Sequence, residues 1–199
     1  RRYGFGVKTG VDLPNEYIGI VPDAQWKKMR LNQPWYQGDT INTSIGQGSF
    51  LATPMQVARD TAIFAMGHDV TPHFIGSING VPQEWHARDI LSQKEKSALK
   101  YIREGMHAVA NIPGGTGFRV LSPSKVTIAA KSGTAQVVGI SQEDKERIKE
   151  SDMEYYERSH AWMTGYAPYE NPRYIVTVLV EHGASGGGAA GPILARIFD

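Results

Sequence analysis

The spacing of apolar residues predicts two amphipathic helices in the middle of the chain. The first begins at Thr53-Pro54-Met55-Gln56, which combines a hydroxyl N-cap, a proline in the first turn and a capping-box glutamine. Gly67 stands where this helix can end. Its expected apolar face consists of Met55, Ala58, Ala62, Ala65 and Met66.

The second helix is predicted from a second capping box. Ser92 and Glu95 have the spacing at which a hydroxyl and a carboxylate satisfy the first free N–H groups of a helix. The inward face of this helix is expected to carry Leu99, Ile102, Met106 and Val109.

Strand-like segments precede and follow the second helix. Residues 75–78 and 81–85 flank Asn79-Gly80, a tight-turn signal, and predict a short hairpin. Longer apolar segments, at 126–138, 161–167 and 174–181, predict three strands, with a turn at 168–172 and a last helix at 192–198. The order of these elements favours an α+β fold in which helices cover an antiparallel sheet.

Two segments lack such a pattern. Residues 1–52 are rich in Gly, Pro and Asn and are predicted to be dominated by loops. Residues 141–158 contain eleven charged residues, seven acidic and four basic. Because so many charges cannot be buried without partners, we expect this segment to be poorly ordered or to protrude from the sheet.

Composition narrows the class of function. With 21 Lys and Arg against 20 Asp and Glu, the formal net charge of +1 gives no electrostatic reason to expect nucleic acid or an anionic membrane as a partner. The chain has no cysteine, so disulfides and thiolate metal sites are excluded. No metal-ligand spacing occurs among the six histidines, and we expect no cofactor.

The predicted strand at 126–138 carries the candidate chemistry. A cation, two hydroxyls and a glycine, at Lys131, Ser132, Gly133 and Thr134, interrupt its apolar pattern, where burying them would be costly without a purpose. Side chains alternate along a strand, so Ser132 and Thr134 should lie on one face and Lys131 on the other. This arrangement suits an extended peptide laid along the strand, with its terminal carboxylate held by hydroxyls and a nearby cation.

The K-[ST]-G tripeptide and several other segments resemble the class B penicillin-binding proteins, in particular those that serve the elongation of rod-shaped bacteria. The matching segments, in chain order, are TGVDLP at 9–14, PWYQGDT at 34–40, IGQG at 45–48, ATPMQ at 52–56, GTG at 115–117 and AWMTGYAP at 161–168. The resemblance implies a penicillin-binding and serine β-lactamase-like transpeptidase fold.

The resemblance also implies an activity and residue roles. A serine of the family attacks the D-alanyl-D-alanine bond of a peptidoglycan stem peptide and passes the acyl group to a neighbouring amine. The backbone N–H of Thr134 would belong to the oxyanion hole, while Ser132, Gly133 and the Thr134 hydroxyl would bind the substrate. Lys131 would supply positive potential and hydrogen bonds across the cleft, and β-lactam antibiotics would acylate the same serine.

Two motifs of the family, S-x-x-K and S-x-N, are not credibly present in residues 1–199. Ser97 and Lys100 match by letter, but they lie opposite the predicted apolar face of their helix. Ser122 is followed by a proline, and Ser77 precedes the Asn79-Gly80 turn. We therefore expect residues 1–199 to be the C-terminal portion of one transpeptidase domain, with both motifs, a pedestal and a membrane anchor upstream.

Alternative functions remain open at this point. The same fold serves D,D-carboxypeptidases and serine β-lactamases, and a chain without the nucleophile could act only as a binding or docking fragment. The family implies a place at the periplasmic face of the bacterial inner membrane, with contact to the membrane only through an upstream anchor. It also implies elongation proteins, a glycan polymerase and a scaffold protein, as partners.

Overall fold

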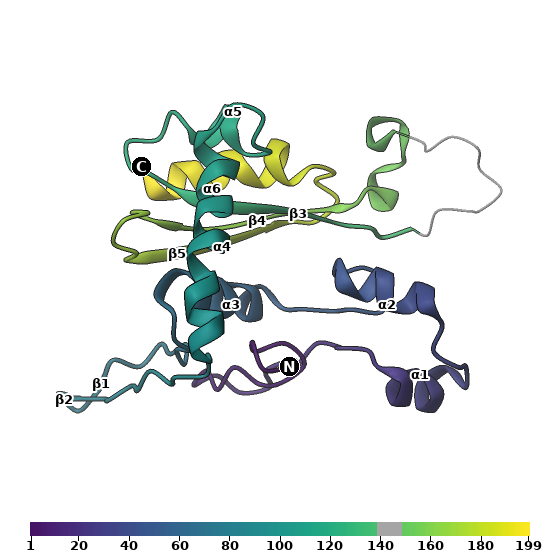
Figure 1. Cartoon of the computed structure of the whole chain (residues 1–199), viewed down its shortest axis with the longest axis horizontal. Coiled ribbons are helices and arrows are strands. Elements are labelled where there is room, and N and C mark those ends of the chain that lie inside the picture. The colour runs from purple at the N-terminus through teal and green to yellow at the C-terminus, as the bar shows by residue number, and fades with distance from the viewer. Residues whose placement is uncertain (139–148) are drawn as a thin grey trace.

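The computed structural model describes residues 1–138 and 149–199 of the chain. Its central feature is an antiparallel sheet of β3 (Ala129–Ala135), β4 (His160–Ala167) and β5 (Tyr174–Val180), hydrogen-bonded in the order β3-β4-β5. Helices lie on both faces of this sheet (Figure 1). The prediction of an antiparallel sheet covered by helices is confirmed, although β3 is shorter than the predicted segment at 126–138.

One face of the sheet is covered by the C-terminal part of the chain. There α5 (Phe118–Leu121) and α6 (Gly191–Phe198) lie above the sheet in Figure 1, and a π-helical turn at Gly186–Ala190 leads into α6. Packing between these elements and the sheet forms the main core, whose fully buried side chains include Leu121, Ile128, Met163 and Leu194.

The opposite face is covered by α3 (Pro54–Met66), and α4 (Gln93–Asn111) runs from this side past the sheet toward α5 (Figure 1). Both predicted capping boxes are present, with Thr53 and Ser92 as N-caps, and α3 ends at Gly67 as predicted. The α4 helix packs against β3, whereas α3 packs against β4 and β5. None of the helices in residues 1–138 and 149–199 is long and apolar enough to cross a bilayer.

The buried face of α3 agrees with the prediction at Ala62 and Ala65 but also includes polar residues that were not predicted. Its most buried residues include Gln56 and Arg59, whereas Met55 and Ala58 are only partly buried. Gln56 donates hydrogen bonds from Nε2 to the carbonyl oxygens of Val7 and Ile18, both at 2.9 Å. The N-terminal segment therefore covers α3 from the side away from the sheet, and polar residues on that side are buried because they have distant partners.

Residues 1–52 are dominated by loops, as predicted, but they also contain two helices that were not predicted from the sequence. These are α1 (Ala24–Leu31), which Asp23 caps by accepting from the Trp26 N–H at 2.8 Å, and α2 (Gln37–Ser44). An isolated antiparallel bridge between Ile20 and Leu51 joins the two ends of the segment that contains both helices. In Figure 1 this segment extends to the right of α3.

The predicted hairpin is confirmed at its turn but is shorter than expected. Only β1 (Ser77–Ile78) and β2 (Val81–Pro82) pair, and Asn79 and Gly80 between them have φ values of 50° and 79°. Both values lie in the left-handed region that a two-residue hairpin turn requires, which explains the residue types.

The charged segment at 141–158 is only partly described by the structure. Residues 141–148 lie outside the described part of the chain, so the prediction of poor order is not tested there. Residues 149–158 form no strand and contain two 3₁₀ turns, Glu150–Asp152 and Tyr155–Glu157. Their side chains are mostly exposed where described, as expected for a segment so rich in charge.

Candidate active site

The four candidate residues lie on β3, which is an outer strand of the three-stranded sheet. The antiparallel register pairs Lys131 with Thr164 and Ser132 with Met163 on β4. Lys131 and Thr134 are exposed, and Ser132 and Gly133 are half-buried. Polar residues can occupy this strand because no described strand pairs with its outer edge, whereas Ala129 and Ala130 at its start are fully buried.

Lys131 and Ser132 lie on opposite faces of the strand, as predicted. The Ser132 hydroxyl forms a 2.8 Å hydrogen bond with the hydroxyl of Thr116, which precedes α5. Lys131 lines a cavity on the other face, together with residues of α3 and α4. Its Nζ atom also reaches the strand edge and donates to the Ser132 carbonyl oxygen at 2.6 Å. The Ser132 hydroxyl therefore lies on one face of the strand, bonded to Thr116, and the Lys131 side chain lies on the other face.

Side-chain donors occupy carbonyl groups along the outer edge of β3. Besides the bond from Lys131 to Ser132, Asn111 Nδ2 donates to the Ile128 carbonyl at 2.8 Å, and Gln47 Nε2 donates to the Thr134 carbonyl at 3.0 Å. The N–H and C=O of one strand residue point to the same side. The N–H of Thr134 therefore also faces the outer edge. Gln47 lies 87 residues away in sequence, so no local pattern could have placed it at this site.

A glycine supports the strand from behind. Gly186, at the start of the π-helical turn, lies so close to the sheet that a Cβ atom there would be 2.3 Å from the Trp162 carbonyl oxygen and 2.6 Å from that of Gly133. Atoms cannot approach so closely without a shift of the backbone. The glycine run therefore allows the C-terminal turn to rest directly on the site strand.

A largely apolar cavity of about 520 Å³ adjoins Lys131 on the α3–α4 side. Phe64, Ile102 and Met106 contribute apolar surface to it. Ile102, predicted to face the core, lines this cavity and is 38% exposed. Asp60 of α3 also lines it, and the Asp60 Oδ1 atom is buried without a hydrogen-bond partner among the described residues. Burial in these surroundings raises the pKa of Asp60 to about 7.

This raised pKa predicts a stability that falls as pH rises. The folded chain binds a proton at Asp60 more tightly than the unfolded chain. The free energy of unfolding therefore decreases between about pH 4 and pH 7, as the buried carboxyl loses its proton, and does not decrease further above that range. Asp60→Asn should therefore leave the free energy of unfolding nearly unchanged at pH 4 and increase it at pH 8. The gain is at most about 4 kcal/mol, since one pKa unit corresponds to 1.36 kcal/mol.

Urea unfolding of both chains across this pH range measures the difference. Asp12→Asn is a suitable control, because hydrogen bonds from the Phe74 and Ile75 N–H groups lower the pKa of Asp12. This substitution should decrease the free energy of unfolding at neutral pH, where Asp60→Asn increases it. An Asp60→Asn gain that did not change with pH would show that charge burial is not its cause.

A chain of threonine hydroxyls connects α3 to the sheet beside Lys131. Thr61 and Thr164 hydroxyls lie 2.7 Å apart, and those of Thr164 and Thr177 lie 2.8 Å apart. Thr164 is also the cross-strand neighbour of Lys131. These bonds hold α3, β4 and β5 together directly behind the lysine.

An aromatic cluster lies next to the far end of β3. His160, which pairs with Ala135, has its ring 4.7 Å from that of His182, and Tyr155 and Tyr156 contact His182. His182 donates its backbone N–H to His160 Nδ1 at 3.0 Å. Within residues 1–138 and 149–199, no three His, Cys, Asp or Glu residues are placed to hold a metal ion.

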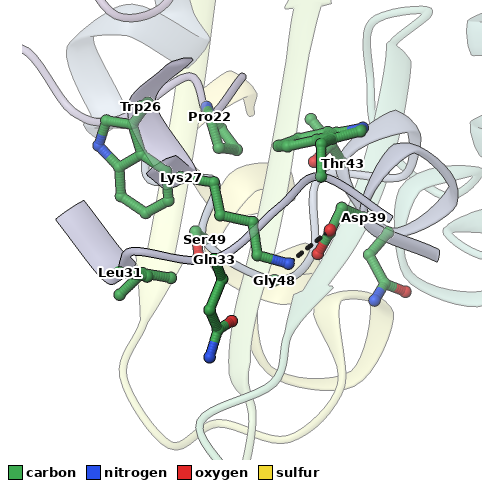
Figure 2. Close-up of a pocket in the computed structure, with 11 residues that line it drawn as sticks. Pro22, Trp26, Lys27, Leu31, Gln33, Asp39, Thr43, Gly48 and Ser49 are labelled. Carbon is green, nitrogen blue, oxygen red and sulfur yellow. Dashed lines mark hydrogen bonds and ion pairs between the residues drawn. The ribbon is translucent and has the colours of Figure 1, made fainter. Parts of the chain in front are cut away.

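A smaller pocket of about 180 Å³ separates α1 from α2 (Figure 2). Its buried Lys27 forms an ion pair with Asp39 at 2.5 Å, and the hydrogen bond from Lys27 lowers the pKa of Asp39. Trp26 and Trp35 line the same pocket. This ion pair fastens the two helices to each other, and the loop after α2 then carries Gln47 to the edge of β3.

The residues that match S-x-x-K only by letter are not placed for catalysis. Ser97 and Lys100 are exposed on α4; the Ser97 hydroxyl donates to the Gln93 carbonyl at 2.9 Å, and Lys100 Nζ lies 4.7 Å from the centre of the Tyr101 ring. Ser122 is exposed at the end of α5. Neither serine lies beside a buried lysine that could act as its base.

Comparison with known families and curated proteins gives consistent matches over the whole chain. Residues 1–199 match a family model described as the penicillin binding protein transpeptidase domain. The peptidoglycan D,D-transpeptidase MrdA of Haemophilus influenzae is 36% identical over 202 residues, which cover 99% of this chain and 31% of that protein. MrdA of Acinetobacter baumannii is 39% identical over 206 residues, covering 100% of this chain and 30% of that protein. The chain thus spans about a third of the length of these curated relatives.

Solved structures agree with the sequence matches. A complex between penicillin-binding protein PBP2 and MreC from Helicobacter pylori contains a chain with 48% identity and a TM-score of 0.85, covering 98% of this chain and 33% of that one. Pseudomonas aeruginosa PBP2 in complex with WCK 5153 has 34% identity and a TM-score of 0.83, covering 100% of this chain and 41% of that one.

Proposed function

Since this chain belongs to the penicillin-binding protein transpeptidase family, we propose that it forms one wall of the active site of a peptidoglycan D,D-transpeptidase that acts in cell-wall elongation. The observation that carries this proposal is the outer edge of β3, which no described strand pairs and where Lys131, Ser132 and Thr134 lie together beside a hydroxyl partner, Thr116. The relatives named MrdA support the reaction and its place in cell-wall synthesis.

In this proposal the donor stem peptide lies extended along the outer edge of β3. Ser132 and Thr134 hydroxyls hold its terminal carboxylate, and the positive charge of Lys131 strengthens those hydrogen bonds. The Thr134 N–H, which faces this edge, donates to the carbonyl oxygen that becomes an oxyanion during attack. Gly133 keeps the strand surface low enough for the peptide backbone to approach.

The nucleophile is proposed to come from an upstream S-x-x-K segment. Its serine oxygen attacks the carbonyl carbon of the D-alanyl-D-alanine bond and forms an ester, and the bond to the terminal D-alanine breaks as that amine gains a proton. An amine of a second stem peptide then attacks the ester, loses its proton and releases the serine. A β-lactam ring opens at the same serine and leaves a stable ester.

Location and partners belong to the same proposal. We place the complete protein at the periplasmic face of the inner membrane, held by an upstream anchor, with glycan polymerase and scaffold proteins as partners. The similarity to a PBP2 chain that was solved together with MreC supports a scaffold partner.

A labelling experiment tests the proposed function. The complete protein, meaning this chain joined to the upstream segments just described, should form a covalent, stoichiometric adduct with a fluorescent penicillin. Residues 1–199 alone should form none, because neither Ser97 nor Ser122 is activated. Denaturing gels followed by peptide mapping measure both results. A stable label on either serine of the isolated chain, or an unlabelled complete protein, would contradict the proposal.

A further inference from the structure

Gln47 occupies the one backbone acceptor that a peptide lying at Thr134 would need. Its Nε2 atom donates to the Thr134 carbonyl oxygen at 3.0 Å, on the outer edge of β3. When a strand is added to a sheet, a residue that faces it exchanges both of its backbone groups, donating its N–H and accepting at its C=O. In this structure the acceptor is already taken, while the Thr134 N–H has no partner among the described residues.

The segment that carries Gln47 lies outside the core. Its contacts with the body of the protein lie near its two ends, where Arg1 donates to the Val21 carbonyl oxygen and the Phe5 ring contacts that of Phe50. Residues 21–50 leave the body of the protein and return to it at the Ile20–Leu51 bridge, whose two backbone hydrogen bonds measure 2.8 and 2.9 Å. Within the segment, α1 and α2 are fastened to each other by Lys27 and Asp39. Neither helix packs extensively against another described element.

Gln47 makes the one hydrogen bond from residues 21–50 to the three-stranded sheet, within the part of the chain that the structure describes. The loop that bears it is itself ordered by hydrogen bonds to the end of α2, since the Gln47 N–H donates to the Asn42 carbonyl at 2.9 Å. The glutamine amide is therefore presented to the strand by a local turn, and only its side chain must rotate for the bond to break.

We propose that Gln47 is a latch that a bound peptide displaces: its side-chain amide stands in for the substrate N–H at Thr134 and closes the strand edge until substrate arrives. This inference rests on the proposed function, because it needs a peptide or β-lactam at β3. The latch lowers the fraction of molecules that can bind, and apparent affinity falls with that fraction. It selects ligands that present their own N–H donor to the Thr134 carbonyl, because such ligands recover the hydrogen bond that they break.

The test is the second-order rate constant for acylation of the complete protein by a fluorescent penicillin. Gln47→Met keeps the length of the side chain and removes the donor, so acylation should become about two- to tenfold faster, the factor by which one net hydrogen bond shifts an equilibrium. Gln47→Glu should act in the same direction, since a carboxylate cannot donate to the carbonyl and is repelled by it. Gln37→Met, at an exposed position of α2, is the matched control and should leave the rate unchanged.

The outcomes separate the latch from the proposed function. If the wild type is acylated and both Gln47 variants react at the same rate or more slowly, the latch is overturned and the proposed function stands. A slower rate would make Gln47 a residue that positions Thr134. A wild type that is not acylated at all would overturn both. Thermal unfolding of each variant shows whether it is folded, and only folded variants enter the comparison of rates.

Discussion

Lys131→Ala is expected to slow acylation of the complete protein by penicillin by more than about a hundredfold, the largest effect on activity that we predict. The substitution removes the positive charge beside the proposed carboxylate site. It also removes the 2.6 Å hydrogen bond from Lys131 Nζ to the Ser132 carbonyl, which helps to fix the edge of β3. Lys125→Ala is the matched control, because Lys125 is an exposed lysine before the same strand, and it should retain the wild-type rate.

Two substitutions at Thr134 separate its hydroxyl from its backbone N–H. Thr134→Val keeps the N–H and the shape of the side chain but loses a charge-assisted hydrogen bond of about 1.5–3 kcal/mol, so acylation should slow by roughly tenfold to a hundredfold. Thr134→Ser keeps the hydroxyl and should lose much less. Equal rates for Thr134→Val and the wild type would move the carboxylate contact to Ser132.

Asp69→Ala is expected to cause the largest loss of stability, about 3–5 kcal/mol in the free energy of unfolding. Asp69 is 1% exposed and accepts two hydrogen bonds from the buried Arg59, both at 2.6 Å, and one from Arg88. Removing the carboxylate leaves the Arg59 guanidinium buried and uncompensated. Urea unfolding measures the loss.

The matched control is another aspartate in an ion pair of similar length. Asp89 pairs with Lys96 at 2.5 Å but is 61% exposed, so solvent screens the pair and Asp89→Ala should cost much less than Asp69→Ala. If the two variants lose similar free energy of unfolding, burial of Arg59 is not the reason for the loss in Asp69→Ala.

The dependence of the Asp69 effect on pH has a defined sign. Burial alone would raise the pKa of Asp69, but the hydrogen bonds and charges of Arg59 and Arg88 outweigh it, and the net pKa is lowered. A lowered carboxyl pKa contributes stability that is present above the ordinary value of about 4 and is lost as pH falls through the folded value. The difference between wild type and Asp69→Ala should therefore be constant near neutral pH and shrink in acid.

Elements specified by neighbouring residues could be predicted from the sequence. The capping boxes at Thr53 and Ser92 and the Asn79-Gly80 turn depend on groups within three or four residues, and all three are present. The three strands follow from continuous apolar segments. The α1 helix was missed because it is short and lacks a strong apolar face, although Asp23 before Ala24 is an N-cap signal that could have located it.

Features that depend on distant partners could not be predicted. An arginine in a helix, such as Arg59, is ordinarily expected to face solvent. Its burial is favourable here only because it bonds to Asp69 and the N-terminal segment covers it. The positions of Lys131 and Ser132 on opposite faces followed from strand alternation. The contacts with Thr116 and Gln47 did not, because each depends on how separate segments meet at β3.

The contact of Gly186 with β3 and β4 limits which residues the chain can carry beneath the candidate site. The residue is buried, and the smallest side chain placed there would push on the carbonyl groups of Gly133 and Trp162. A substitution at this buried position would therefore distort the strand that carries Lys131 and Thr134 without touching either side chain.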